Sequence, residues 1–298
     1  MEYRILGKSD LKISRLGFGS MSLEADNPPN ERLLHQALER GINYFDTADL
    51  YQRGGNEILL GRAFKGKRDQ LILATKVGNQ WRPDGSGWDW NPSKKYIVEA
   101  VEESLKRLQT DYIDLYQLHG GTLEDPVDEI IETMETLQKS GKIRYYGISS
   151  IRPNVIRTFT QRSSIISVMM QYSLLDRRPE EEMLSFLHEH GIGVLTRGSI
   201  AKGLLLSKPP ERYLNYSVEQ VMQLKDVLKS VSQPPGTPLA TALQYVWQAE
   251  GVCSAVLGIR TEEQLMAALV AGSSSALTQT QWKQLREVLP ANKYVDHR

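Results

Sequence analysis

Four side chains of different chemical types lie at or just beyond the ends of short apolar runs in the first half of the chain: Asp46, Tyr51, Lys76 and His119. Together they fit one reaction, the delivery of a hydride to a carbonyl group followed by protonation of the resulting alkoxide. A tyrosine can supply that proton, and a neighbouring ammonium lowers the phenol pKa from its ordinary value of about 10. Lys76 supplies the ammonium and Asp46 can hold it in place. His119 can donate a hydrogen bond to the carbonyl oxygen.

Each of these residues alone would usually have a structural role. An aspartate after a strand most often caps a turn or a helix, and a single lysine is usually a solvated charge. The chemical interpretation therefore requires elements that bring the four side chains together.

The surrounding sequence alternates between short apolar runs and longer amphipathic stretches. Helical patterns lie at 30–40, 92–108, 126–140 and 179–190, and several begin with Pro or a capping residue. This alternation predicts parallel strands joined by crossover helices. Eight such repeats in 298 residues predict one (β/α)8 TIM barrel domain over 1–298, preceded by a β-hairpin with arms at 3–6 and 11–14. The strand-like runs are 15–19, 42–45, 71–75, 113–118, 143–148, 166–171, 193–196 and 254–257.

The carboxyl ends of the strands carry the active site in such a barrel. Asp46, Lys76 and His119 stand at the ends of three runs, and polar residues also follow the later runs, so we expect all of them to meet on one face. Irregular stretches are expected at 80–91, 207–215 and 233–237, with a Ser-rich loop at 272–277. The tryptophans of the first stretch, among them Trp81, either line a substrate pocket or only pin the loop.

The chain resembles the aldo-keto reductase family nearly from end to end. The segments that carry the resemblance are GINYFDTADLY at 41–51, LATK at 73–76, IDLYQLH at 113–119, IRYYGISS at 143–150 and QYSLLDR at 171–177. The resemblance implies a catalytic tetrad of Asp46, Tyr51, Lys76 and His119. It also implies NADPH or NADH without a metal, and reduction of a small carbonyl substrate. We expect the substrate pocket to include Tyr51 and His119, with Trp81 beside them if the loop tryptophans line it.

The same resemblance implies a set of cofactor-binding residues: Gly19, Ser20, Asp46, Ser149, Ser150, Gln171, Arg197, Gly198, Ser199, Gly258, Arg260, Thr261 and Gln264. Three positions depart from the family pattern. Ser150 stands where the family usually has Asn, and Arg197 stands where an aromatic ring usually stacks on the nicotinamide, although a guanidinium can also lie flat on a ring. Ala267 and Ala268 follow Gln264 where an Asn is common.

NADPH is favoured over NADH by Arg260, which can pair with a 2′-phosphate, with Thr261 beside it. The segment also opens a helix, and a helix N-terminus attracts an anion.

Composition limits the other function classes. Lys plus Arg and Asp plus Glu are both 36, so the net charge is zero and gives no electrostatic reason to expect nucleic acid or an anionic membrane as a partner. No run of 18 apolar residues suggests a membrane span. The single cysteine, Cys253, is consistent with a reducing, cytoplasmic setting. Nothing in the sequence indicates the oligomeric state.

Three alternatives compete with this interpretation. A metal-dependent hydrolase would need several ligands at strand ends, but His119 is the one clear candidate. A Rossmann dehydrogenase would need a third glycine after GFGS at 17–20, where Ser22 stands instead. A regulatory subunit like those of potassium channels, which the family includes, would keep the tetrad and bind NADPH while acting through partners.

Overall fold

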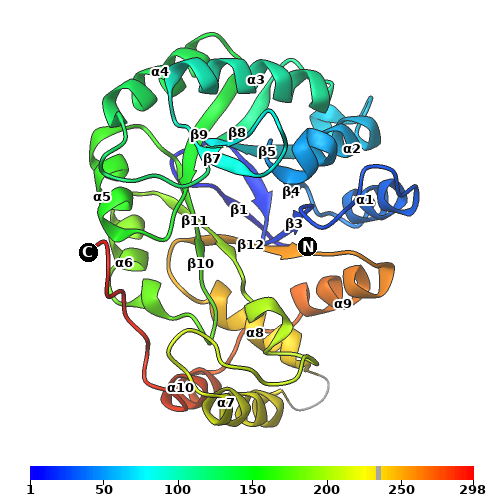
Figure 1. The fold of residues 1–298 in the computed structure, drawn as a ribbon. Coiled ribbons are helices and arrows are strands. Elements are labelled where there is room, and N and C mark those ends of the chain that lie inside the picture. Colours follow the sequence, from blue (N-terminus) through cyan, green and yellow to red (C-terminus); the bar gives the residue numbers. More distant parts are fainter. Residues whose placement is uncertain (233–235) are drawn as a thin grey trace.

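A closed barrel of parallel strands forms the centre of the molecule (Figure 1). The computed structural model describes residues 1–232 and 236–298, so part of the stretch expected to be irregular at 233–237 lies outside the described residues. Each strand pairs with the next along the chain, and the last pairs with the first. The strands are β3 (Leu16–Gly19), β4 (Tyr44–Asp46), β5 (Ile72–Val77), β8 (Ile113–Leu118), β9 (Ile143–Ser149), β10 (Ser167–Gln171), β11 (Gly193–Arg197) and β12 (Val252–Gly258). The predicted (β/α)8 fold is confirmed, and the closed sheet excludes a Rossmann dehydrogenase.

Helices surround this barrel. They are α1 (Pro29–Glu39), α2 (Gly55–Ala63), α3 (Lys94–Leu108), α4 (Val127–Lys139), α5 (Pro153–Arg162), α6 (Met183–Glu189), α7 (Val218–Val231), α8 (Pro238–Trp247), α9 (Glu262–Gly272) and α10 (Gln279–Glu287). The expected helix at 179–190 is wrong at its start: a separate turn, η3 (Arg178–Glu180), precedes α6, because the backbone leaves helical geometry at Glu182 (φ −153°). In the described part of the chain, no helix is long and apolar enough to cross a membrane.

The barrel is closed at its amino end by the predicted hairpin, β1 (Tyr3–Ile5) and β2 (Lys12–Ser14). Leu6, Leu11 and Ile13 are fully or almost fully buried and join the apolar barrel interior. Gly7 turns at φ +54°, and a Cβ there would lie 2.1 Å from the Ile166 carbonyl oxygen, so the close approach of hairpin and barrel requires glycine.

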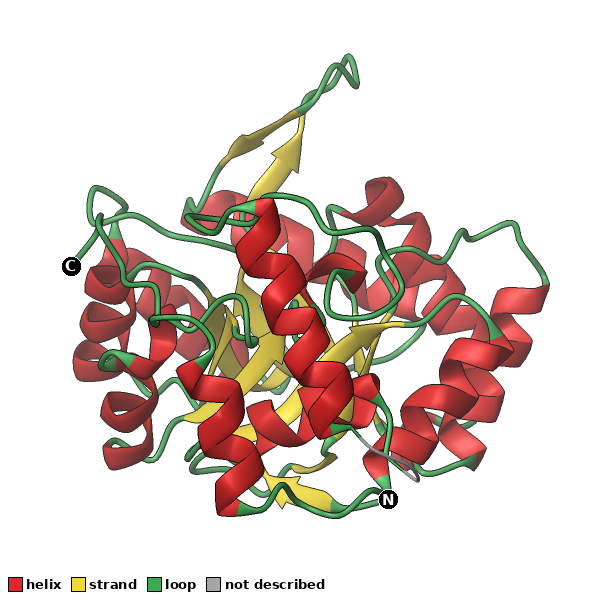
Figure 2. Ribbon diagram, turned by 90° about the horizontal axis from the view of Figure 1, so that it is seen from below, coloured by secondary structure: helices red, strands yellow, loops and turns green. Residues whose placement is uncertain are grey.

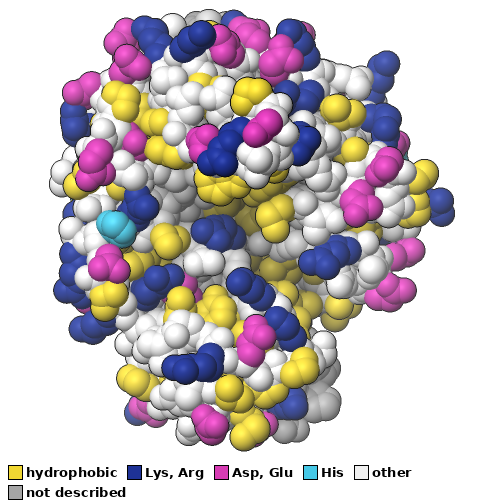
Figure 3. Space-filling view, in the orientation of Figure 1, with side chains coloured by type: hydrophobic (Ala, Val, Ile, Leu, Met, Phe, Trp, Pro, Cys, Tyr) yellow, Lys and Arg dark blue, Asp and Glu magenta, His cyan; other side chains and the backbone are white. Residues whose placement is uncertain are grey.

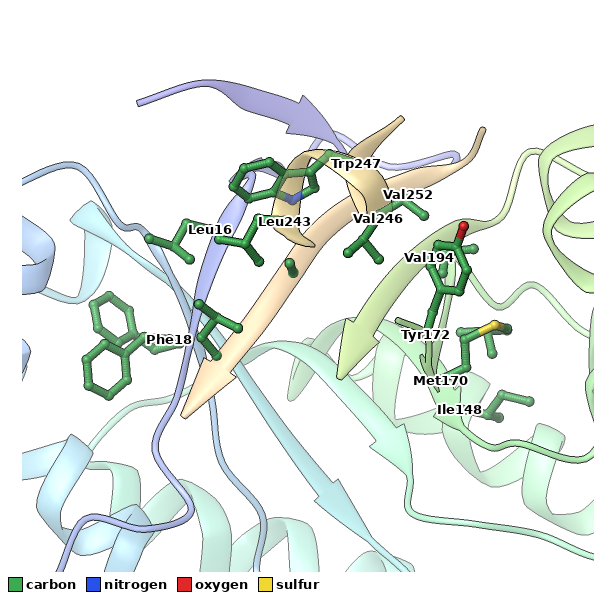
Figure 4. Packing of buried hydrophobic residues seen from close by; sticks show 14 of the residues in the cluster. Leu16, Phe18, Ile148, Met170, Tyr172, Val194, Leu243, Val246, Trp247 and Val252 are labelled. Atoms are coloured by element: carbon green, nitrogen blue, oxygen red, sulfur yellow. The ribbon is translucent and has the colours of Figure 1, made fainter. Parts of the chain in front are cut away.

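The larger part of the core lies between the strands and the outer helices (Figure 4). There Leu243 and Val246 of α8 pack in the same cluster as Leu16 and Phe18 of β3. The Trp247 indole at the end of α8 also donates to the Arg15 carbonyl at 2.9 Å. These contacts fix the strands, and therefore the positions of the residues at their carboxyl ends.

A second hairpin replaces the irregular stretch expected at 80–91. Its arms, β6 (Asn79–Trp81) and β7 (Trp88–Trp90), pair antiparallel, and it projects from the barrel end opposite β1 and β2 (Figure 2). The expectation was wrong because the arms are only three residues long, too short to show the period of a strand.

Candidate active site

The Asp46 carboxylate and the Lys76 ammonium form a buried ion pair between neighbouring strands. Lys76 Nζ lies 2.5 Å from Asp46 Oδ1 and 2.7 Å from the Thr47 carbonyl oxygen. Gln117 Nε2 donates to the other carboxylate oxygen of Asp46 at 3.4 Å. Two of the three N–H groups of the ammonium are therefore used, and one remains for another acceptor.

Electrostatics keep Lys76 protonated. Burial lowers the pKa of Lys76, but the Asp46 carboxylate and the Tyr51 hydroxyl outweigh burial, so this pKa lies above its ordinary value. Burial raises the pKa of Asp46, and the Lys76 ammonium offsets part of that increase. Lys76 thus keeps a positively charged ammonium, held by Asp46, at the barrel mouth at neutral pH.

Tyr51 faces this charge. It begins the short turn η1 (Tyr51–Gly54) in the loop after β4, and Lys76 Nζ lies 5.1 Å from the centre of its ring. The His119 ring approaches the Tyr51 ring edge-on, with 5.9 Å between the ring centres. The structure therefore brings together the four side chains that the sequence singled out.

His119 is neutral in this setting. Burial, with the positive charges of Lys76 and Arg197, lowers the pKa of His119 to about 3. Its backbone is held by Val77 and by the Asn79 side chain, which donates to the His119 carbonyl at 3.2 Å. A neutral imidazole keeps one N–H donor, and His119 Nδ1 is buried without a hydrogen-bond partner among the described residues.

The turn that follows Tyr51 is left-handed, which costs about 1–2 kcal/mol for each residue that is not glycine. Gln52 and Arg53 have φ of 52° and 54°. The Gln52 amide donates to the Leu23 carbonyl at 2.8 Å, and the Arg53 guanidinium stacks over the Trp81 ring at 4.9 Å. The Trp81 indole donates to the Leu50 carbonyl at 2.9 Å. Trp81, expected in the substrate pocket, thus also pins the Tyr51 turn.

The strand ends beside the tetrad are small and open. In the barrel register Gly258 pairs with Gly19, and Gly19 pairs with Asp46. A Cβ built on Gly258 meets no atom within 4 Å, and Gly198 turns at φ +70° after β11. The face that carries these ends is hollowed at its centre, with hydrophobic and basic side chains around the hollow (Figure 3).

Arg197, in register with Gln171, is a partly buried cation at this mouth. Across residues 1–232 and 236–298 its guanidinium forms no ion pair or side-chain hydrogen bond. Burial lowers its pKa, against the influence of Tyr51, Tyr213 and other acidic groups. A desolvated guanidinium without a partner favours a bound ligand with a negative charge or a planar face. Together with the free imidazole nitrogen of His119, it fits a nicotinamide dinucleotide.

The side chains of several predicted cofactor-binding residues form hydrogen bonds within the protein or are buried. Ser20 Oγ donates to the Asp46 carbonyl at 2.7 Å, and Ser199 and Thr196 share a hydrogen bond of 3.0 Å. Ser150 Oγ accepts from the Arg152 amide at 3.2 Å. Ser149 is buried at the end of β9. Contacts from Ser20 and Ser199 to a ligand would therefore need their backbone or a local rearrangement, whereas the Ser150 hydroxyl keeps its proton to donate.

Asn56 is a supporting residue that the sequence did not reveal. It is fully buried in the first turn of α2. Its amide donates to the carbonyl groups of Ser20 and Leu23, and its oxygen accepts from Thr47 and lies 2.6 Å from the Ser20 hydroxyl oxygen. It ties together the loops after β3 and β4. No spacing or residue type distinguishes it from a surface asparagine.

A separate surface site lies at the start of α9. Thr261 caps this helix by accepting from the Gln264 amide, and the Gln264 side chain accepts from the Arg260 amide at 2.9 Å. Arg260 and Arg32 of α1 line a cavity of about 360 Å³. The Arg260 side chain is exposed and can meet an anion there.

Known proteins match both the sequence and this fold. The aldo/keto reductase family profile matches residues 15–290. YqkF of Bacillus subtilis (strain 168), an uncharacterized oxidoreductase, is 48% identical over 307 residues, with 100% of each chain covered. The aldo-keto reductase yakc of Schizosaccharomyces pombe, whose name specifies NADP(+), is 34% identical over 65% of this chain and 60% of its own.

A solved structure agrees closely. The aldo-keto reductase AKR11C1 from Bacillus halodurans, in its holo form, is 49% identical with a TM-score of 0.94, covering 100% of this chain and 99% of that one. Aldo-keto reductases carry out NAD(P)H-dependent carbonyl reduction. The chain belongs to the aldo/keto reductase family and is an NAD(P)H-dependent oxidoreductase.

Proposed function

We propose that the protein reduces aldehydes or ketones to alcohols with NADPH, and that Tyr51 is the general acid. The observation that carries this proposal is the buried ion pair of Lys76 and Asp46, which faces the Tyr51 ring beside a neutral His119.

Each side chain of the tetrad has its own role in the reduction of the carbonyl group. NADPH, when bound, supplies the hydride that forms the new C–H bond at the carbonyl carbon. The neutral His119 donates a hydrogen bond that orients the carbonyl and disperses the developing negative charge. The Tyr51 hydroxyl gives its proton to the alkoxide oxygen, which completes the alcohol. The Lys76 ammonium stabilises the phenolate that remains until solvent returns a proton, and Asp46 holds Lys76 in place.

The residues around the mouth support a nicotinamide dinucleotide. Arg197 would meet the nicotinamide with its planar guanidinium, and Gln171 lies beside it in the barrel register. Gly198 and Gly258 would leave room for the cofactor, and Gly19 lets β3 pack closely against β12 beside them. Ser20, Ser149, Ser150 and Ser199 complete the set of proposed contacts at the strand ends.

NADPH is proposed over NADH because of the start of α9. Arg260 and Thr261 line the cavity there, where Arg260 would pair with the 2′-phosphate and Gln264 would hold the segment in shape. The name of the fission yeast relative, which specifies NADP(+), supports the same choice.

A substrate panel tests the proposal. Purified protein is mixed with NADPH and a series of aldehydes, ketones and sugars, and loss of NADPH absorbance is followed. Turnover of at least one class without any partner protein is expected. NADPH binding with no turnover on the whole panel would contradict the proposal and favour a regulatory subunit.

A further inference from the structure

Asp49 is a buried carboxyl two residues before Tyr51 that the mechanism above does not use. Only 7% of its surface is exposed. Its backbone amide donates to the Lys76 carbonyl at 3.2 Å, which joins the Tyr51 loop to β5. Its Oδ2 accepts from the Tyr96 hydroxyl of α3 at 2.8 Å.

Tyr96 connects Asp49 to the backbone at His119 through Asn79. Its hydroxyl also lies 3.4 Å from the Asn79 carbonyl oxygen, and the Asn79 side chain donates to the His119 carbonyl at 3.2 Å. One chain of hydrogen bonds thus touches the loop of Tyr51 and the backbones of Lys76 and His119. Resting on the proposed function, we propose that Asp49 is a positioning residue, which acts through Tyr96 to fix the Tyr51 turn relative to Lys76 and His119.

The protonation state of Asp49 decides which groups donate and which accept in this chain of hydrogen bonds. A tyrosine hydroxyl has one donor and two acceptor sites. When Asp49 carries a proton, it can donate to Tyr96, and Tyr96 can donate to the Asn79 carbonyl. When Asp49 is ionised, the single Tyr96 proton is taken by Asp49, and the link to Asn79 is lost. The protonated form of Asp49 is therefore the form that connects all three catalytic segments.

The surroundings favour that protonated form. The buried Glu57 carboxylate forms an ion pair with the Arg107 guanidinium at 2.7 Å and accepts a hydrogen bond from the Thr75 hydroxyl at 2.6 Å. Asp49 Oδ1 has no hydrogen-bond partner in the described part of the chain. Burial and the neighbouring Glu57 raise the pKa of Asp49 to about 7. The titratable or charged groups around Asp49, including those of the adjoining cavity, are Glu57, Tyr96, Arg107, Tyr116, Arg53, Glu99 and Glu103.

This pKa also sets the direction of a stability effect. The folded-state pKa lies above that of an unfolded aspartate, about 3.9. The stability that protonated Asp49 contributes is therefore fully present below about pH 4 and is lost as pH rises towards 7. The amide side chain of the variant Asp49→Asn cannot ionise. The unfolding temperature of this variant minus that of the wild type should therefore increase as pH rises through this range.

The kinetic test compares wild type, Asp49→Asn, Tyr96→Phe and a matched control, Asp69→Asn, whose carboxyl is exposed on η2 (Arg68–Gln70). The new amide at position 49 can donate to Tyr96 at every pH. From one pH unit below 7 to one above, a group of pKa 7 goes from about 90% to about 10% protonated. Wild-type kcat on an aldehyde should therefore fall relative to kcat of Asp49→Asn, by up to about ninefold, with KM for NADPH unchanged.

Tyr96→Phe should lower kcat at both pH values, and Asp69→Asn should follow the wild type. Hydrogen exchange gives a readout that does not depend on turnover. Amides of residues 49–54 should exchange several-fold faster in Tyr96→Phe than in the wild type or the control.

Matching pH profiles of wild type and Asp49→Asn, or unchanged exchange at 49–54 in Tyr96→Phe, would overturn the positioning role. If the wild type reduced no carbonyl at all, the proposed function would fail by itself. The exchange measurement would then decide the positioning role alone.

Discussion

In the proposed mechanism Tyr51 acts as an acid because the groups around it hold their protons in a particular pattern. Lys76 stays charged through Asp46, and His119 stays neutral through burial and two nearby cations. In that mechanism the cation would stabilise the phenolate, while the neutral imidazole would donate a hydrogen bond without competing as an acid. This division of labour leads to separate predictions for the residues.

Tyr51→Phe should abolish most turnover and leave NADPH affinity nearly unchanged, because only the phenol hydroxyl is removed. Single-turnover kinetics and a fluorescence titration of the cofactor measure the two effects. A variant that kept more than about a tenth of the wild-type rate, with chemistry limiting, would show that another group is the acid.

Lys76→Met should lose activity at neutral pH and also stability. Removing the cation leaves the buried Asp46 carboxylate uncompensated, which typically costs about 3–5 kcal/mol. Denaturant unfolding and a pH–rate profile measure both losses. The exposed Lys95→Met on α3 is the matched control and should behave as the wild type. An unchanged pH–rate profile in Lys76→Met would contradict the role of the ammonium.

Arg260→Ala should weaken NADPH more than NADH, because only NADPH carries the 2′-phosphate. A charge-assisted contact of about 1.5–3 kcal/mol corresponds to a roughly ten- to hundredfold rise in Kd. Titration of both cofactors at low and high ionic strength measures the effect, which salt should reduce. Arg4→Ala, exposed on the hairpin at the far end of the barrel, is the control. Equal losses for NADPH and NADH would show that Arg260 does not bind the phosphate.

The helices and strands hold the site residues in place, and close packing of two helices leaves no space for a side chain at one glycine. A Cβ on Gly61 of α2 would lie 2.3 Å from the Arg107 carbonyl oxygen and 2.7 Å from the Leu108 carbonyl carbon, so α2 touches the end of α3 directly. Gly61→Ala should destabilise the fold by about 1–3 kcal/mol, as overpacking does. Gly272→Ala, at the end of α9 with no described residue's atom within 4 Å, should be neutral or slightly stabilising. Equal unfolding midpoints for the two variants would disprove the close packing.

The elements also show what the sequence could and could not predict. All eight barrel strands follow from apolar runs, because a strand buried on both faces reads as a continuous apolar segment. The β6–β7 hairpin escaped prediction because its arms, three residues each, are too short to show the alternation of a strand. That Asp46, Tyr51, Lys76 and His119 lie together could be predicted from residue types at strand ends. The contacts of Asn56 and Tyr96 could not, since both depend on helices packing beside those ends.

At the scale of the whole molecule, the two ends of the barrel differ: one is sealed by a hairpin and the other is open. The β1–β2 hairpin seals one end with Leu6, Leu11 and Ile13. The other end is hollowed and carries Arg197 and the tetrad (Figure 3). Stability and chemistry are therefore separated along the barrel axis, and loops around the mouth can vary without disturbing the seal.

The transfer of deuterium tests the central claim most directly. Wild-type protein is incubated with an aldehyde and NADPH that carries deuterium at the transferable position of the nicotinamide, and the alcohol is analysed by mass spectrometry and NMR. The proposed mechanism predicts one deuterium on the carbinol carbon, and little product from Tyr51→Phe under the same conditions. An alcohol without deuterium, or bound NADPH that transfers nothing to any carbonyl tested, would contradict it.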